Sequence, residues 1–137
     1  GTVDREAFTA FYGSCRLPLV YNGGLRTQEE MQELLQAYPR LEGLMLGRGL
    51  LANPALAAGF RQGNTLPVSE LYRKVGQMHQ LIYAEYARTL EGGEAQILQK
   101  LKPMWEYCLP DLDKKARKAI LKSNKLDAYL RAVREAL

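Results

Sequence analysis

The 137-residue sequence predicts an α/β unit with two parallel strands, followed by an all-α helical bundle domain. Three observations support this fold class. Residues 1–62 alternate between helical and strand patterns, which is typical of a parallel sheet with crossover helices. Residues 63–68 form a polar linker that contains glycine and proline, and this composition marks a domain boundary. Residues 69–137 carry helical patterns, with breaks between them.

The first helix and the first strand are indicated by residue type and spacing. Asp4 is a suitable N-cap for the helix. Its apolar stripe, at helical spacing, consists of Phe8, Phe11, Tyr12 and Cys15. Pro18 requires the helix to end before it. Residues 17–21 are apolar without alternation, so they predict a strand that is buried on both faces, as in a parallel sheet.

A second helix and a second strand follow. Thr27 and Glu30 have the spacing of a capping box. The apolar stripe of this helix consists of Met31, Leu34, Leu35 and Tyr38. Residues 41–46 predict the second strand, and a short helical segment with Pro54 near its start comes next. Because two strands do not form a stable sheet alone, they belong to a larger fold or pair with a second copy.

Four residues of the helical half carry specific expectations. His79 is the single histidine and has no second ligand type near it, so we expect a structural or surface residue rather than a metal ligand. Trp105 and Tyr107 are expected in the core of the bundle, although either could stack on nucleic-acid bases instead. Pro103 predicts a kink or a boundary within the helical pattern at 94–107.

Composition and charge restrict the class of protein. No apolar run is long enough to span a membrane, and the N-terminal residues lack the pattern of a secretory signal. The two cysteines have no metal-type spacing and fit a reduced, cytoplasmic setting. Residues 1–70 hold six Lys/Arg and seven Asp/Glu, whereas residues 71–137 hold thirteen and eight. The excess of positive charge in the second half indicates an anionic partner.

Two glycine-containing turns each follow a predicted strand and precede a helix. The candidate anion-binding residues in them are Asn22, Gly23, Gly24, Gly47 and Arg48. Backbone N–H groups in such turns lack internal partners, and glycine lets an anion approach them closely. The Arg48 side chain can add a charge-assisted contact. Either motif alone fits a plain turn, but at the ends of consecutive parallel strands the two fit a phosphate-binding site equally well.

A lysine-rich segment is the main basic feature of the helical half. Residues 114–125 contain six basic residues and no acidic residue. The candidate RNA-binding residues are Lys114, Lys115, Lys118, Lys122 and Lys125. Lys114, Lys118 and Lys122 share one face of a helix, and Lys125 lies near this face. A cationic face suits the shape and backbone of a folded RNA, and the alternative is a solvated lysine face without a partner.

Three segments of the chain resemble one family. LPLVYNGGL, TQEEMQELL and LEGLMLGRGLLANPAL are similar to the last two strand units of the tRNA-dihydrouridine synthases. The tail also resembles this family, with a Trp-x-Tyr at 105–107, a lysine-rich helix and LDAYLRAV. The resemblance covers essentially the whole chain. It implies an α/β fragment of a (β/α)8 barrel followed by an all-α helical bundle domain.

The resemblance also implies an activity. Members of the family use FMN to reduce a specific uridine of tRNA to 5,6-dihydrouridine, and NADPH reduces the flavin. The FMN phosphate would be held by Asn22, Gly23 and Gly24 and by Gly47 and Arg48. Many members have Asp where this chain has Gly24, which leaves only the backbone N–H for a contact there. The helical domain would help to bind tRNA in the cytoplasm.

The chain departs from the family in length. The first six barrel strands and the catalytic cysteine of the family have no counterpart here, since neither Cys15 nor Cys108 matches that cysteine. We therefore assign no catalytic residue and no metal ligand, and expect the isolated fragment to be inactive. Its partners would be tRNA and the missing part of the barrel, or a second copy bound through exposed strand edges. Two alternatives remain, namely a non-enzymatic RNA-binding helical module with an αβαβ scaffold, and another FMN-barrel oxidoreductase.

Overall fold

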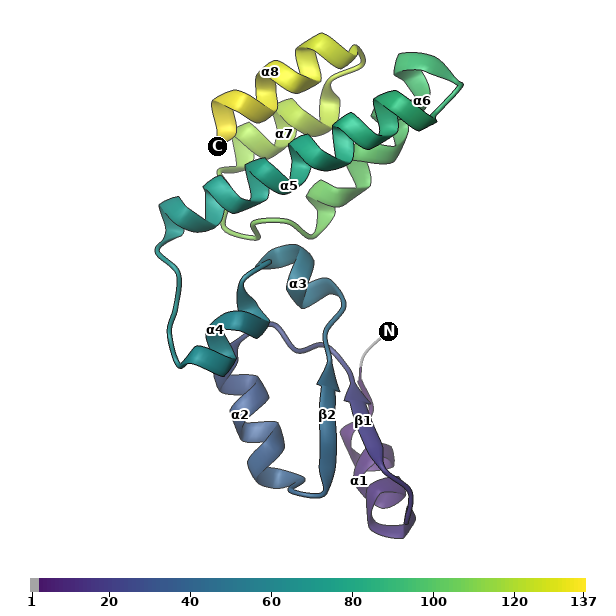
Figure 1. Cartoon of the computed structure of the whole chain (residues 1–137), viewed down its shortest axis with the longest axis vertical. Helices are drawn as coiled ribbons and strands as arrows, with labels where there is room; N and C mark the ends of the chain where they lie inside the picture. The colour runs from purple at the N-terminus through teal and green to yellow at the C-terminus, as the bar shows by residue number, and fades with distance from the viewer. Residues whose placement is uncertain (1–2) are drawn as a thin grey trace.

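The computed structural model describes residues 3–137, which form an α/β unit and a helical unit along the long axis of the molecule (Figure 1). The elements of the α/β unit are α1 (Arg5–Ser14), β1 (Leu19–Asn22), α2 (Gln28–Ala37), β2 (Leu41–Met45), α3 (Arg48–Ala52) and α4 (Leu56–Gln62). An extended segment, residues 63–67, connects this unit to the helical unit. The predicted order of helices and strands is confirmed.

The helices of the α/β unit begin where the sequence places their caps. The Asp4 carboxylate accepts a hydrogen bond from the Ala7 N–H (2.9 Å), which starts α1. The Thr27 hydroxyl accepts from the Glu30 N–H (3.1 Å), and the Glu30 carboxylate accepts from the Thr27 N–H (3.2 Å). The predicted capping box is therefore confirmed at the start of α2.

The two strands are parallel and adjacent, with Val20 opposite Gly43 and Asn22 opposite Met45. Tyr21 points into the core of the α/β unit, where the Phe8 ring lies edge-on to it at a centroid distance of 4.8 Å. The alternate residues point the other way, because successive side chains of a strand lie on opposite faces.

The prediction of a strand at 17–21 that is buried on both faces is wrong. The strand runs from Leu19 to Asn22, and Val20 is 61% exposed. Met45 of the neighbouring strand is 57% exposed. Among the described residues, helices cover the Tyr21 side of the sheet and nothing comparable covers the Val20 side. Some apolar side chains of the two strands are thus left exposed by this part of the fold.

The helical unit has its own apolar core. Its elements are α5 (Val68–Thr89), α6 (Gly93–Leu101), the 3-10 helix η1 (Lys102–Glu106), α7 (Lys114–Lys122) and α8 (Leu126–Ala136). The expected boundary at Pro103 is confirmed, because α6 ends at Leu101 and the chain continues as η1. Proline has no N–H to donate and it clashes with the preceding turn of an α-helix, which accounts for the change of helix type. None of the described helices is both long and apolar enough to cross a membrane.

A buried polar network lies in the centre of the helical unit. The Trp105 indole N–H donates to the Tyr129 hydroxyl oxygen (2.8 Å), and that hydroxyl lies 2.9 Å from Nε2 of His79. Tyr129 is fully buried, so its own proton needs an acceptor, and Nε2 of a neutral His79 is the one in reach. Burial lowers the pKa of His79 to about 4. His79, which is 3% exposed, is thus a structural residue of the core.

Candidate functional site

The two glycine turns meet at one end of the sheet. A cavity of about 380 Å3 is lined by all five predicted anion-binding residues, namely Asn22, Gly23, Gly24, Gly47 and Arg48. The turns come together because β1 and β2 are parallel, so that their carboxyl ends reach the same edge of the sheet. The structure thus places the five residues of two separate sequence motifs around one cavity.

The backbone N–H groups of the glycine turns differ in their hydrogen-bond partners from the N–H groups at the start of α2. The Glu30 carboxylate accepts hydrogen bonds from the N–H groups of Arg26 (2.7 Å) and Thr27 (3.2 Å), so the start of α2 is already satisfied. By contrast, none of the turn and cap hydrogen bonds between described residues is donated by Gly23, Gly24 or Arg48. As far as residues 3–137 are concerned, these N–H groups can therefore donate to an anion in the cavity.

The second turn is shorter than the sequence suggests. Gly47-Arg48-Gly49 was expected to precede a helix, but α3 begins at Arg48. This helix has five residues, so its dipole contributes little to the site, and the charge comes from the Arg48 side chain.

Two glycines make the geometry of the cavity feasible. Gly24 has a φ of +56°, a left-handed conformation that favours glycine. Gly49 is buried, and a Cβ there would collide with the carbonyl oxygen of Leu25, so the two turns can approach each other only with glycine at this position. Gly49 is a site residue that the sequence analysis did not single out, although its place in Gly-Arg-Gly was a signal.

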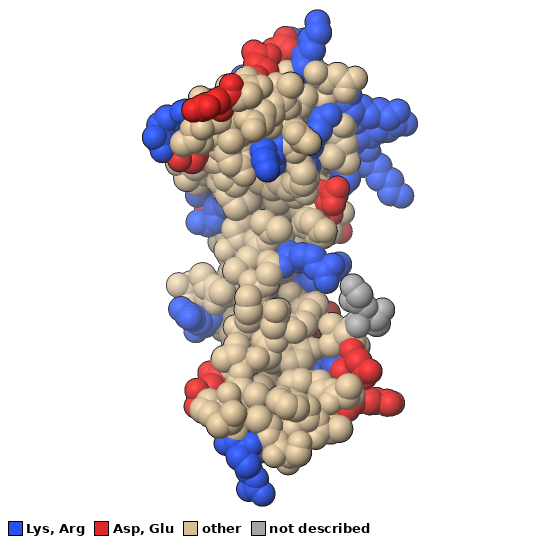
Figure 2. All heavy atoms as spheres, turned by 90° about the vertical axis from the view of Figure 1, so that its right-hand side faces the viewer, with Lys and Arg blue, Asp and Glu red and all other residues tan. Residues whose placement is uncertain are grey.

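The predicted RNA-binding lysines are all exposed on the helical unit. Lys114, Lys115, Lys118 and Lys122 belong to α7, and Lys125 is the N-cap of α8. The Asp113 carboxylate caps α7 by accepting from the N–H groups of Lys115 (2.9 Å) and Ala116 (3.0 Å). Figure 2 shows Lys and Arg side chains gathered on one side of the helical unit. We call these five residues the lysine face.

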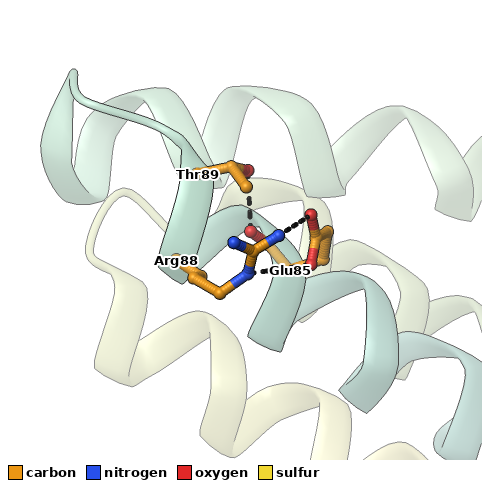
Figure 3. A network of polar contacts seen from close by, with 3 residues as sticks. All are labelled: Glu85, Arg88 and Thr89. Carbon is orange, nitrogen blue, oxygen red and sulfur yellow. Dashed lines mark hydrogen bonds and ion pairs between the residues drawn. The ribbon is translucent and has the colours of Figure 1, made fainter.

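The lysine face differs from other charged parts of the helical unit. On α5, the Arg88 guanidinium donates to the Glu85 carboxylate at 2.7 and 3.3 Å, and the Thr89 hydroxyl donates to the Glu85 carbonyl oxygen at 2.7 Å (Figure 3). None of the ion pairs within residues 3–137 includes a residue of the lysine face. The positive charge of Arg88 is thus neutralised by an ion pair with Glu85, whereas the lysine face has no such ion pair within residues 3–137.

Arg117 lies in the same basic segment but has a different role. Its guanidinium donates to the carbonyl oxygens of Trp105, Cys108 (3.1 Å) and Leu109. Leu109 has a φ of +46°, a conformation that a residue with a Cβ rarely adopts without support. Arg117 thus holds the loop after η1 in place and is half-buried there.

Arg117→Ala is expected to lower the free energy of unfolding by about 2–3 kcal/mol, because several charge-assisted hydrogen bonds to carbonyl groups are lost. Lys118→Ala, one residue away on the exposed side, should change it by less than about 0.5 kcal/mol. Urea unfolding followed by Trp105 fluorescence measures both values. Equal effects of the two substitutions would contradict the structural role of Arg117.

The two aromatic residues of the Trp-x-Tyr motif differ in burial. Trp105 is fully buried in the core, as expected. The expectation that Tyr107 is also buried is wrong, because its side chain is 38% exposed. The chain leaves η1 at Glu106, so Tyr107 no longer follows the helical periodicity that would turn it toward the core.

Comparisons with known proteins agree on one family. The sequence model described as dihydrouridine synthase (Dus) matches residues 6–133. The chain is also 35% identical over 60 residues to the mouse (Mus musculus) protein named tRNA-dihydrouridine(20a/20b) synthase (NAD(P)+)-like. That alignment covers 44% of this chain and 18% of the mouse protein, so the chain spans about a fifth of its relative.

Proposed function

Because the chain belongs to the dihydrouridine synthase family, we propose that it is part of an FMN-dependent enzyme that reduces uridine to 5,6-dihydrouridine in tRNA, with NADPH as the reductant. The observation that carries the proposal is the cavity formed by the two glycine turns, which combines an arginine with N–H groups that donate to no turn or cap residue within residues 3–137. Together with the family match, it accounts for both motifs of the α/β unit.

The cavity fits the phosphate end of FMN. The N–H groups of Gly23, Gly24 and Arg48 would donate to phosphate oxygens, and the Arg48 guanidinium would neutralise charge. Asn22 and Gly47 line the same cavity. Bound FMN supplies the hydride chemistry of the reaction, and the residues of this chain hold its phosphate and so orient it.

The catalytic acid and the remaining flavin contacts lie, in this proposal, in barrel strands outside this chain. Cys108 is fully buried, and burial raises the pKa of its thiol to about 11, so it is a poor proton donor to a substrate. Cys15 follows the end of α1, away from the cavity lining. The exposed apolar side chains of Val20 and Met45 support a barrel in which further strands cover this face of the sheet.

The lysine face is the proposed tRNA contact. Five exposed lysines that form no ion pair within residues 3–137 can replace counterions along a phosphate backbone. An RNA-binding module without enzymatic activity would also use this face, but it would leave the cavity of the glycine turns without a role.

The test uses the whole enzyme that contains this chain. Purified protein should carry FMN and convert uridine to 5,6-dihydrouridine in tRNA, as measured by nucleoside mass spectrometry. Arg48→Ala should weaken FMN binding by about ten- to hundredfold, because a charge-assisted contact is lost. Arg61→Ala, an exposed arginine outside the cavity lining, serves as the control. FMN-loaded protein that leaves every tRNA uridine unreduced would refute the proposed activity.

A further inference from the structure

A second cavity lies between the two units. It has a volume of about 410 Å3, which is within the usual range for small-ligand sites. Arg26, Thr27, Arg48 and Asn53 line it from the α/β unit, and the two arginines also line the cavity of the glycine turns. Glu106 at the end of η1, and Tyr107 and Asp111 in the loop after it, line the cavity from the helical unit, and this loop faces α3 across the junction (Figure 1). We call this cavity the interunit cleft.

The interunit cleft has four charged side chains, namely Arg26, Arg48, Glu106 and Asp111, and none has a partner among the described residues. None of the hydrogen bonds or ion pairs between residues 3–137 involves the side chain of Arg26, Glu106 or Asp111. The two arginines belong to the α/β unit and the two carboxylates to the helical unit. A ligand that fits them must carry negative charge at one end and hydrogen-bond donors at the other.

Tyr107 adds an aromatic surface to the same wall as the carboxylates. It is exposed, although the other aromatic residue of its motif, Trp105, is in the core. A flat ring that covers an exposed tyrosine would remove apolar area from water, and nucleobases stack on such side chains in single-stranded RNA complexes.

We propose that the interunit cleft holds one unpaired nucleotide of the RNA, separate from the uridine that is reduced. Tyr107 stacks on the base, Arg26 pairs with a phosphate oxygen, and Glu106 and Asp111 accept hydrogen bonds from an exocyclic amino group. The two carboxylates repel phosphate, so they direct the backbone toward the Arg26 wall. This inference rests on the proposed function in one respect, namely that the partner is RNA.

The arrangement predicts base selectivity. Adenine and cytosine carry an exocyclic amino group that a carboxylate can accept from, whereas uracil presents carbonyl oxygens in its place. The cleft therefore favours adenine or cytosine over uracil, and this preference distinguishes it from a site for the reduced base.

The experiment titrates this chain with tetraadenylate, tetracytidylate and tetrauridylate and follows binding by calorimetry. Tetraadenylate and tetracytidylate should bind at least about fivefold more tightly than tetrauridylate. Tyr107→Ala should weaken their binding by about tenfold, whereas Tyr107→Phe, which keeps the ring, should stay within about twofold of the wild type. Glu106→Gln combined with Asp111→Asn should reduce the preference over tetrauridylate. Arg26→Gln should weaken the binding of all three tetranucleotides, because Arg26 pairs with a phosphate oxygen, whereas the control Arg61→Gln, which also removes one exposed arginine, should leave binding unchanged.

The outcomes that test the interunit cleft are distinct from those that test the proposed enzymatic activity. All variants are first checked for native Trp105 fluorescence and circular dichroism. Equal binding of the three tetranucleotides, or unchanged affinity in Tyr107→Ala, overturns the inference even if tRNA binds through the lysine face. Failure of the whole enzyme to reduce uridine would refute the proposed activity, whereas selective tetranucleotide binding that depends on Tyr107 would still support the cleft.

Discussion

Replacing Lys114, Lys118 and Lys122 by alanine is expected to weaken tRNA binding by about ten- to hundredfold at low salt, because each lysine that contacts a phosphate releases a counterion. The slope of log affinity against log salt should fall in magnitude by about 2 to 3, or close to one for each lysine. These residues are exposed and point away from the core, so the fold should be retained. Fluorescence titrations with tRNA at several salt concentrations measure both quantities.

A matched variant separates the lysine face from net charge. Arg61, Arg88 and Arg131 are exposed and lie outside the lysine face, and replacing all three by alanine removes the same charge. We expect this variant to lose much less affinity and to keep most of the salt dependence. If both triple variants lose the same affinity, overall charge and not the lysine face determines RNA binding.

Acid is expected to destabilise the helical unit through His79. In the folded state burial lowers its pKa to about 4, whereas in the unfolded chain it titrates near 6.5. The unfolded state therefore binds the proton first, so the stabilisation is fully present above about pH 6.5 and is lost as the pH falls toward 4. The loss should be on the order of 2–3 kcal/mol at pH 4. Urea unfolding at pH 7 and pH 4, followed by Trp105 fluorescence, measures it.

His79→Gln isolates this contribution from that of the carboxylates. The glutamine has no proton to gain in this range, and its amide oxygen can still accept from the Tyr129 hydroxyl. The difference in stability between pH 7 and pH 4 should shrink by on the order of 2–3 kcal/mol relative to the wild type. An unchanged difference would show that His79 is not buried in its neutral form.

Local signals in the sequence predict the start or end of several elements. Asp4, and Thr27 with Glu30, each cap a helix through hydrogen bonds to residues within the next three positions. Pro103 changes the helix type through its own ring and its missing N–H. Such signals depend on neighbours along the chain, so they can be interpreted without knowledge of the fold.

The candidate site is predicted in part. The residue types of both glycine turns indicate an anion site, and the parallel arrangement inferred from the αβαβ order places them at one edge. By contrast, the close approach of Gly49 to the Leu25 carbonyl oxygen joins two residues that no sequence pattern relates, so the requirement for glycine at position 49 is not predicted. The basic segment indicates an anionic partner, but its composition does not separate Arg117 from the lysines beside it.

The sequence by itself determined the order of elements, the helix caps and the chemistry of the two turns, because these depend on interactions within a few residues. The tertiary structure decided which side chains are buried and what they contact. His79 and Tyr129 are 50 residues apart and meet in the core, and Arg117 turns inward to the carbonyl groups of another segment. Trp105 is buried in the core of the helical unit, whereas Tyr107 is exposed beside the interunit cleft.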